Sequence, residues 1–164
     1  MPGWTPFQTV GPFLHIGLRE GRGPMSAHDL PDTIVISGRL LDGTGDGISD
    51  GVVEFWGAGF DNLGRVWTAA DGGYRLTTRK PRARTAPDGV HAPHFAVRVL
   101  ARGIQTQYVT RVYFDDEATN ERDTVLAAVP ADRRGTLIAA AVAPADYRFD
   151  IVVQGDRETV FFAL

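Results

Sequence analysis

The stretch that decides the fold runs from residue 66 to residue 78 and reads Val-Trp-Thr-Ala-Ala-Asp-Gly-Gly-Tyr-Arg-Leu-Thr-Thr. Its two ends, 66–68 and 74–78, are rich in the aromatic and β-branched residues that pack well on a sheet. Between them lies Asp71-Gly72-Gly73, and such residues accept the positive φ values of the tight turns that join antiparallel strands. The stretch therefore predicts a β-hairpin.

Similar short strand patterns recur along the chain and are separated by turn sequences. In 95–101, for example, Phe95, Val97 and Val99 alternate with Ala96 and Arg98, as expected for a strand with one buried face. The predicted strands are 33–41, 51–56, 66–68, 74–78, 95–101, 109–114, 136–141, 147–153 and 159–162. This pattern predicts an all-β fold, an antiparallel β-sandwich of about eight to nine strands.

One short helix and an extended N-terminal arm complete the prediction. The helix is expected within 115–129, capped by Asp115 or Asp116 and docked through Val125 and Leu126. Residues 1–32 contain several prolines and glycines that interrupt regular elements, together with seven large apolar side chains that need a surface to cover. We therefore divide the chain into an arm and loop, 1–32, which packs on a partner, and a sandwich, 33–164.

Composition excludes several classes of protein. The 164 residues are 43% hydrophobic, carry a net charge of −3 and include no cysteine. This composition is typical of one globular domain and excludes disulfides and thiolate metal sites. There is no basic field for nucleic acid or for a membrane surface, and no apolar run long enough to span a bilayer. The start of the chain lacks the pattern of a signal peptide, so we expect a cytoplasmic protein.

The residues alone do not assemble an active site. His91 and His94 flank Pro93, which prevents the helix that would place both imidazoles on one face. No phosphate-binding loop and no serine nucleophile turn is present. Arg102 ends a predicted strand beside Gly103, where its guanidinium is either an ordinary surface charge or a group that binds a carboxylate through two hydrogen bonds.

Several runs of the sequence resemble a known family. They are 5–18 (TPFQTVGPFLHIGL), 36–40 (ISGRL), 92–95 (APHF), 101–104 (ARGI), 110–117 (TRVYFDDE), 147–151 (YRFDI) and 158–162 (ETVFF). The chain is similar, nearly end to end, to the intradiol ring-cleaving dioxygenases. Within that family it most resembles the alpha subunits of protocatechuate 3,4-dioxygenases.

The resemblance implies that this chain binds no metal. In the family, the beta subunit holds Fe(III) through two tyrosinates and two histidines, the latter from a His-x-His on a strand. The matching positions here are His94 and Ala96, so Ala96 replaces the second histidine and His94 is a vestigial ligand position. The two stretches expected to supply the tyrosines, 57–64 and 82–93, contain none. The resemblance thus implies no catalytic residue in this chain, and Fe(III) bound by the partner beta subunit.

The resemblance also implies which residues reach the partner's substrate pocket. Thr9, Gly11 and Pro12 match arm residues that wall the pocket, and Arg102 matches an arginine directed into it. The expected partner is a protocatechuate 3,4-dioxygenase beta subunit in a higher αβ oligomer. The complex is expected to cleave protocatechuate with O₂ to 3-carboxy-cis,cis-muconate, and this chain is expected to be inactive alone. Segments before Thr33 and after Trp56 are shorter than in typical alpha subunits, which leaves the stoichiometry open.

Two alternatives remain open at this point. The first is a stand-alone β-sandwich that binds a ligand without catalysis, using Trp4, Trp56 or Trp67 as stacking platforms. The second is a homomeric intradiol enzyme whose iron ligands have moved to other phenols of the chain, namely Tyr74, Tyr108, Tyr113 and Tyr147.

Overall fold

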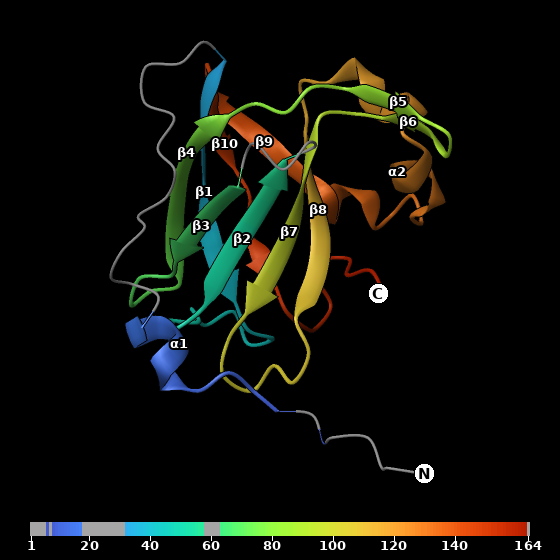
Figure 1. Ribbon diagram of the computed structural model, residues 1–164. Helices are drawn as coiled ribbons and strands as arrows, with labels where there is room; N and C mark the ends of the chain where they lie inside the picture. Colours follow the sequence, from blue (N-terminus) through green and yellow to red (C-terminus); the bar gives the residue numbers. More distant parts are fainter. Residues whose placement is uncertain (1–5, 7, 18–31, 58–62, 164) are drawn as a thin grey trace.

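The computed structural model describes residue 6 and residues 8–17, 32–57 and 63–163 (Figure 1). The strands are β1 (Thr33–Leu41), β2 (Val52–Gly57), β3 (Leu63–Trp67), β4 (Gly73–Arg79), β5 (Arg84–Ala86), β6 (Gly89–His91), β7 (His94–Leu100), β8 (Tyr108–Phe114), β9 (Ile138–Ala143), β10 (Asp146–Arg148) and β11 (Ile151–Val152). The short α-helices are α1 (Pro12–Gly17) and α2 (Thr124–Ala128), and 3₁₀ turns span Ala118–Arg122 and Arg134–Leu137. The predicted all-β class is confirmed.

Nearly all the strands form one folded-over sheet. Its order is β11-β1-β10-β9-β8-β7-β2-β3, with β4 paired to β1, while β5 and β6 make a separate hairpin. Most pairings between described strands are antiparallel, as predicted, but β10 and β11 run parallel to β1, and β9 runs parallel to β8. Because β9 pairs with both β8 and β10, it joins the two halves of the sheet.

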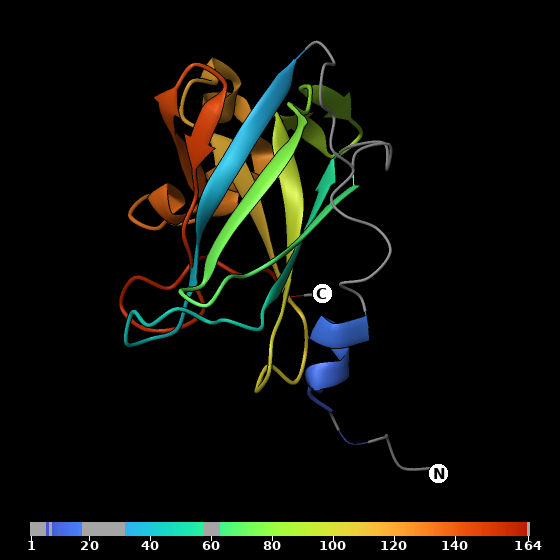
Figure 2. The same ribbon diagram turned by 90° about the vertical axis from the view of Figure 1, so that its left-hand side faces the viewer.

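The two halves enclose one main core (Figure 2). Alternate residues of each strand face inward, so Phe95, Val97 and Val99 of β7 are all fully buried, as the sequence predicts. The side chains facing them from the other half include Ile34, Ile36 and Leu40 of β1, Leu76 of β4 and Tyr147 of β10. A smaller cluster, Ala92, Tyr113, Leu126, Val129 and Leu137, packs α2 against the outer side of β8.

The prediction of a hairpin at 66–78 is wrong. The turn itself forms: the N–H of Ala69 donates to the carbonyl of Gly73 at 2.8 Å, and Gly72 has the positive φ of 79° that the sequence requires. However, β3 pairs with β2, and β4 pairs with β1. The N–H of Leu40 in β1 donates to the carbonyl of Gly72 at 2.9 Å. The turn therefore carries the chain from one half of the sheet to the other.

The predicted helix is shorter and its cap is different. Asp123 caps α2, and neither Asp115 nor Asp116 does. Asp115 instead accepts a hydrogen bond from the N–H of Ala141, and Asp116 pairs with Lys80 at 3.0 Å. Leu126 docks in the small apolar cluster, as predicted, whereas Val125 is not part of it.

Further segments differ from the prediction, among them 147–153, which contains parts of two short strands, β10 and β11, in place of one strand. Residues 159–162 form no strand, although the N–H of Phe162 donates to the carbonyl of Val109 at 2.8 Å. The hairpin of β5 and β6 was not predicted. The arm contains the helix α1 where irregular chain was expected, because proline at the first helical position has a suitable φ and needs no hydrogen bond there.

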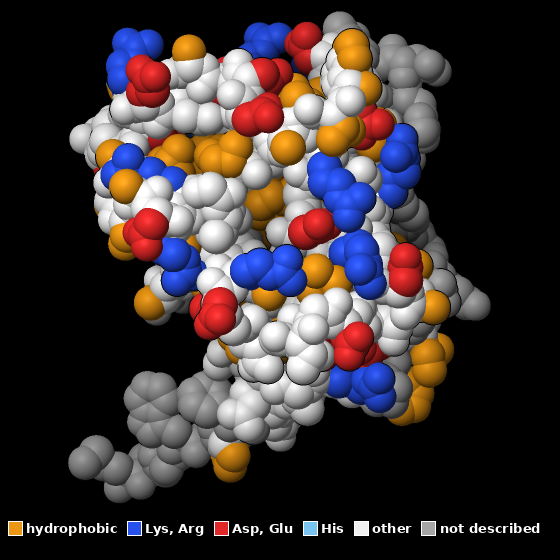
Figure 3. Space-filling view, turned by 180° about the vertical axis from the view of Figure 1, so that it is seen from behind, with side chains coloured by type: hydrophobic (Ala, Val, Ile, Leu, Met, Phe, Trp, Pro, Cys, Tyr) orange, Lys and Arg blue, Asp and Glu red, His pale blue; other side chains and the backbone are white. Residues whose placement is uncertain are grey.

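The surface carries charges of both signs. On the face shown in Figure 3, basic and acidic side chains are interleaved, with apolar side chains in the hollows between them. Within the described ranges, no helix is both long and apolar enough to cross a bilayer.

Candidate functional site

The N-terminal arm passes under the loop that joins β7 to β8 (Figures 1 and 2). The N–H of Gly103 donates to Oγ1 of Thr9 at 2.9 Å. Gly103 has a φ of 83°, and the N–H of Ile104 donates to the carbonyl of Ala101 at 3.2 Å, so Arg102 and Gly103 form the tip of a tight turn. Two of the predicted pocket residues, Thr9 and Arg102, therefore lie at the same end of the sandwich, although 93 positions separate them in the sequence.

The other two predicted pocket residues follow directly along the arm. Pro12 begins α1, and the carbonyl of Gly11 accepts from the N–H of Leu14 at 3.1 Å. Gly11 is exposed, and apart from its two chain neighbours no described residue lies within 4 Å of the position that a Cβ would take there. Nothing in the described part of this chain therefore requires glycine at position 11.

Arg102 is exposed but held at one atom. Its Nε donates to Oδ2 of Asp50, a charge-assisted hydrogen bond between residues 52 positions apart. The side chain of Arg102 is 66% exposed, whereas that of Asp50 is 21% exposed. No local sequence pattern points to Asp50, because its ion-pair partner lies 52 positions away in the chain.

A cavity of about 610 Å³ lies beside this turn. It is bounded by the arm, by the loop between β7 and β8, and by the C-terminal segment. Its lining includes Gln8, Val10, Ile104, Tyr108 and Phe161, and the rings of the last two lie 4.8 Å apart. This end of the sandwich is thus hollowed and largely apolar; Arg102 is not among the residues that line the cavity.

His94, the predicted vestigial ligand position, lies elsewhere, on the outer side of β7 and β8 beside Tyr113. His94 is 8% exposed, and its Nδ1 lies 2.7 Å from the carbonyl oxygen of Ala92, to which it donates. Burial lowers the pKa of His94 to about 4, so the ring is neutral at neutral pH. Ala96, two residues along β7, stands opposite Arg111 of β8 in the register of the sheet.

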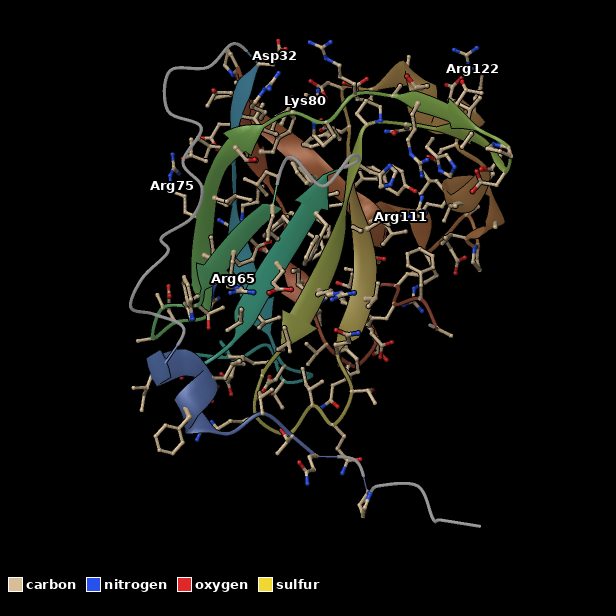
Figure 4. All side chains as sticks on the ribbon, in the orientation of Figure 1. Asp32, Arg65, Arg75, Lys80, Arg111 and Arg122 are labelled. Atoms are coloured by element: carbon tan, nitrogen blue, oxygen red, sulfur yellow. The ribbon has the colours of Figure 1, made fainter. Side chains whose placement is uncertain are left out.

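Arg111 belongs to a chain of polar groups under α2 and the β5–β6 hairpin (Figure 4). Its Nη1 lies 3.2 Å from the hydroxyl of Tyr113 and 3.5 Å from Nδ1 of His91. The hydroxyl of Tyr113 donates to Asp123 at 3.1 Å, and burial raises the pKa of Tyr113 to about 12. The phenol is therefore protonated at neutral pH and donates to a carboxylate.

Asp123 is the last member of this series of polar groups, and it is the N-cap of α2 in place of the predicted Asp115 or Asp116. Its carboxylate is fully buried and accepts hydrogen bonds from the N–H groups of Ala92, Val125 and Leu126, as well as from Tyr113. Its position directly before the apolar run 124–128 is the local signal that identifies it as an N-cap.

The residues at the predicted ligand positions, His94 and Ala96, do not fit ferric iron. Ala96 offers a methyl group in place of a second imidazole, and the cationic Arg111 stands opposite it in the register of the sheet. Across the described ranges, no three side chains of His, Cys, Asp or Glu come together in a way that suits a metal ion.

The four phenols of the alternative with relocated iron ligands do not come together at one site. The hydroxyl of Tyr74 donates to the carbonyl of Phe149 in the core, and that of Tyr147 donates to Asp116. Tyr108 stacks on Phe161 at the other end of the sandwich. Each of these phenols, like Tyr113, has its own partner in a different part of the fold.

Two of the three tryptophans predicted as stacking platforms lie among the described residues. Arg98 covers the ring of Trp56, with its guanidinium carbon 5.4 Å from the ring centre. The indole Nε1 of Trp67 is buried, but the side chain as a whole is half-buried and lines an open hollow with Arg39 and Arg75. Trp4, the third predicted platform, lies outside the described residues.

Comparisons with known proteins agree with this geometry. No protein-family model matches the chain. The protocatechuate 3,4-dioxygenase alpha chain of Burkholderia cepacia is 41% identical, and that of Pseudomonas putida 37%, each alignment covering 96% of this chain and at least 95% of the relative. The protocatechuate 3,4-dioxygenase beta chain of Burkholderia cepacia is 26% identical over 79% of this chain and 68% of its own.

A solved structure shares the fold. The dioxygenase domain of a dioxygenase–carbohydrate-binding fusion protein from Streptomyces sp. SirexAA-E superposes with a TM-score of 0.61 at 19% identity, over 94% of this chain and 97% of that one. Together with the similarity to the alpha chains, which extends over almost the whole sequence, this leads to one conclusion. The chain belongs to the family of protocatechuate 3,4-dioxygenase alpha chains.

Proposed function

We propose that this chain is the non-iron-binding alpha subunit of a protocatechuate 3,4-dioxygenase. In this proposal a beta subunit holds Fe(III), and the complex cleaves protocatechuate with O₂ to 3-carboxy-cis,cis-muconate. The observation that carries the proposal is the 41% identity to an alpha chain over 96% of this sequence. The match to a beta chain and the unsuitable donor set around His94 support it further.

The proposed contribution of this chain is a wall and a cation for the partner's pocket. Thr9, Gly11 and Pro12 form the wall, and the guanidinium of Arg102 binds the ring carboxylate of protocatechuate. The hydrogen bond between Thr9 and Gly103 supports this assignment because it holds the arm beside Arg102. The open space around Gly11 supports it as well, because another chain can approach the backbone closely there.

The proposal includes the arm, 1–32, as the segment that packs on the partner. Phe13 and Ile16 of α1 are 81% and 62% exposed, and their spacing of three places them on one face of the helix. Two large apolar side chains exposed together favour a contact with another chain. The complex is proposed to be a higher αβ oligomer in the cytoplasm.

The first test compares the chain with and without its partner. Purified alone, the chain is expected to contain no stoichiometric iron and to consume no O₂ with protocatechuate. Co-expressed with a beta chain, it is expected to co-purify as an iron-containing complex that does both. Iron analysis and an oxygen electrode measure the two properties, and a chain that is iron-loaded and active alone would contradict the proposal.

The second test concerns Arg102→Ala in the complex. Loss of a charge-assisted hydrogen bond is expected to raise the KM for protocatechuate about tenfold or more, because such bonds contribute roughly 1.5–3 kcal/mol. Catechol has no carboxylate, so its KM is expected to change little. An equal loss for both substrates would indicate a structural role for Arg102.

A further inference from the structure

We infer that Asp50 is a positioning residue that fixes the Arg102 guanidinium so that its two terminal amino groups face an incoming carboxylate. The inference rests on the proposed function of Arg102 and adds a residue that the sequence patterns do not single out. It starts from the hydrogen bond between Nε of Arg102 and Oδ2 of Asp50.

The backbone on the Asp50 side is firmly held. The N–H of Gly51 donates to Oγ1 of Thr68 at 2.9 Å, and the carbonyl of Gly51 accepts from the N–H of Thr68 at 3.0 Å. Thr68 is 2% exposed, so both bonds are shielded from water. The residue next to Asp50 is thus fixed to the end of β3, and the Asp50 carboxylate has a defined place from which to bind Arg102.

The backbone on the Arg102 side is also held, but its side chain is not. Ala101 is fully buried, and Gly103 is tied to Thr9 of the arm. The side chain of Arg102 nevertheless extends into solvent, where a long arginine samples many rotamers. The carboxylate of Asp50 is the group that restricts these rotamers, because it binds the guanidinium at Nε.

The atom that Asp50 occupies determines how a substrate can bind. A guanidinium offers a carboxylate two bidentate approaches, one through Nε and a terminal nitrogen and one through both terminal nitrogens. With Nε engaged by Asp50, the end-on approach through Nη1 and Nη2 remains. The site therefore suits a planar carboxylate that meets the arginine head-on, such as the carboxylate of an aromatic acid.

The negative charge of Asp50 acts in the opposite direction, because it lowers the attraction of Arg102 for an anion. The two effects are separable by substitution. Asp50→Ala removes both the hydrogen bond and the charge, whereas Asp50→Asn removes the charge but keeps an oxygen that accepts from Nε. If positioning dominates, the alanine variant is impaired and the asparagine variant is not.

The experiment measures steady-state O₂ uptake by the αβ complex with protocatechuate and with catechol. Asp50→Ala is expected to raise the KM for protocatechuate about two- to tenfold, the range for ordering one flexible side chain, and to leave kcat nearly unchanged. The KM for catechol is expected to stay constant, and Asp50→Asn is expected to remain within about twofold of the parent. Asp50→Ser, which also withdraws the carboxylate, is expected to match the alanine variant and replaces it if that complex does not assemble. Asp156→Ala, at an exposed turn, is the matched control.

The outcomes separate this inference from the proposal on which it rests. If Arg102→Ala leaves the KM for protocatechuate unchanged, the proposed role of Arg102 fails and Asp50 has nothing to position. If Arg102→Ala raises that KM but Asp50→Ala leaves it unchanged or lowers it, the inference about Asp50 alone is overturned. An equal rise for protocatechuate and catechol in Asp50→Ala overturns it too. In the Arg102→Ala background, Asp50→Ala is expected to have no further effect.

Discussion

Asp123→Ala is expected to lower the free energy of unfolding of this chain by about 4 kcal/mol, because one buried carboxylate satisfies four donors. Two of them are the N–H groups of Val125 and Leu126 at 3.0 and 2.8 Å, and loss of an N-cap costs about 1 kcal/mol. The other two are the N–H of Ala92 at 2.8 Å and the hydroxyl of Tyr113 at 3.1 Å. Each of these buried donors costs about 1–3 kcal/mol when it loses its acceptor.

Equilibrium unfolding in urea, followed by tryptophan fluorescence, measures this loss. Asp132→Ala is the matched control, since Asp132 is exposed and its substitution is expected to change stability by less than about 0.5 kcal/mol. Asp123→Asn is expected to fall between the two: its oxygen can still cap α2, but its amide N–H then opposes the N–H of Ala92. A loss below about 1.5 kcal/mol for Asp123→Ala would refute the reasoning, because it would leave nothing beyond the cap.

The same carboxylate makes the stability depend on pH in a defined direction. Burial by itself raises the pKa of Asp123, but the hydrogen bonds from Leu126, Ala92 and Tyr113 outweigh it and hold the pKa below its usual value. A lowered pKa gives stability that is present above the unfolded-state pKa, about 3.9, and is lost as the pH falls through the folded-state value. The difference in stability between the parent and Asp123→Asn is therefore expected to shrink below about pH 4.

Three further variants probe other contacts. Gly38→Ala is expected to destabilise the fold by about 3 kcal/mol, because the added methyl would collide with the carbonyl of Phe149; Gly135→Ala, which meets nothing within 4 Å, is the control in thermal unfolding. Ala96→His is expected to bind no stoichiometric iron by elemental analysis, because it restores one imidazole but no phenolate and faces a guanidinium. Lys80→Met is expected to lower the free energy of unfolding by about 1–2 kcal/mol, measured in urea, because it leaves the carboxylates of Asp116 and Glu117 without their cation.

The strands were predictable where the pattern is local. Phe95, Val97 and Val99 alternate with more polar residues, and period-2 alternation is a direct consequence of strand geometry. Strand partners were not predictable in the same way. Asp71-Gly72-Gly73 specifies a sharp reversal, but packing of the apolar faces decides which ladder each flanking strand joins. A turn sequence alone therefore cannot distinguish a hairpin from a crossing between the halves of a sandwich.

Some residues of the candidate site could be predicted from the sequence, and others could not. Resemblance identified Thr9 and Arg102, and the structure places them at one end of the sandwich. Asp50 could not be found, because its contact joins two turns that are close only after folding. Asp123 could have been found, since it directly precedes a short apolar helix, but the adjacent acids at 115 and 116 gave a more conspicuous signal.

The way β9 joins the two halves has a consequence for how the molecule opens. Along that side, β9 pairs with β8 through its first two residues and with β10 through later ones, so backbone ladders connect the two halves. On the opposite side no ladder joins β3 to β4 among the described residues, and only the turn between them and side-chain packing hold the halves together. We therefore expect the two halves to separate first along the side of β3 and β4. Amide hydrogens are expected to exchange with deuterium first near β3 and last near β9.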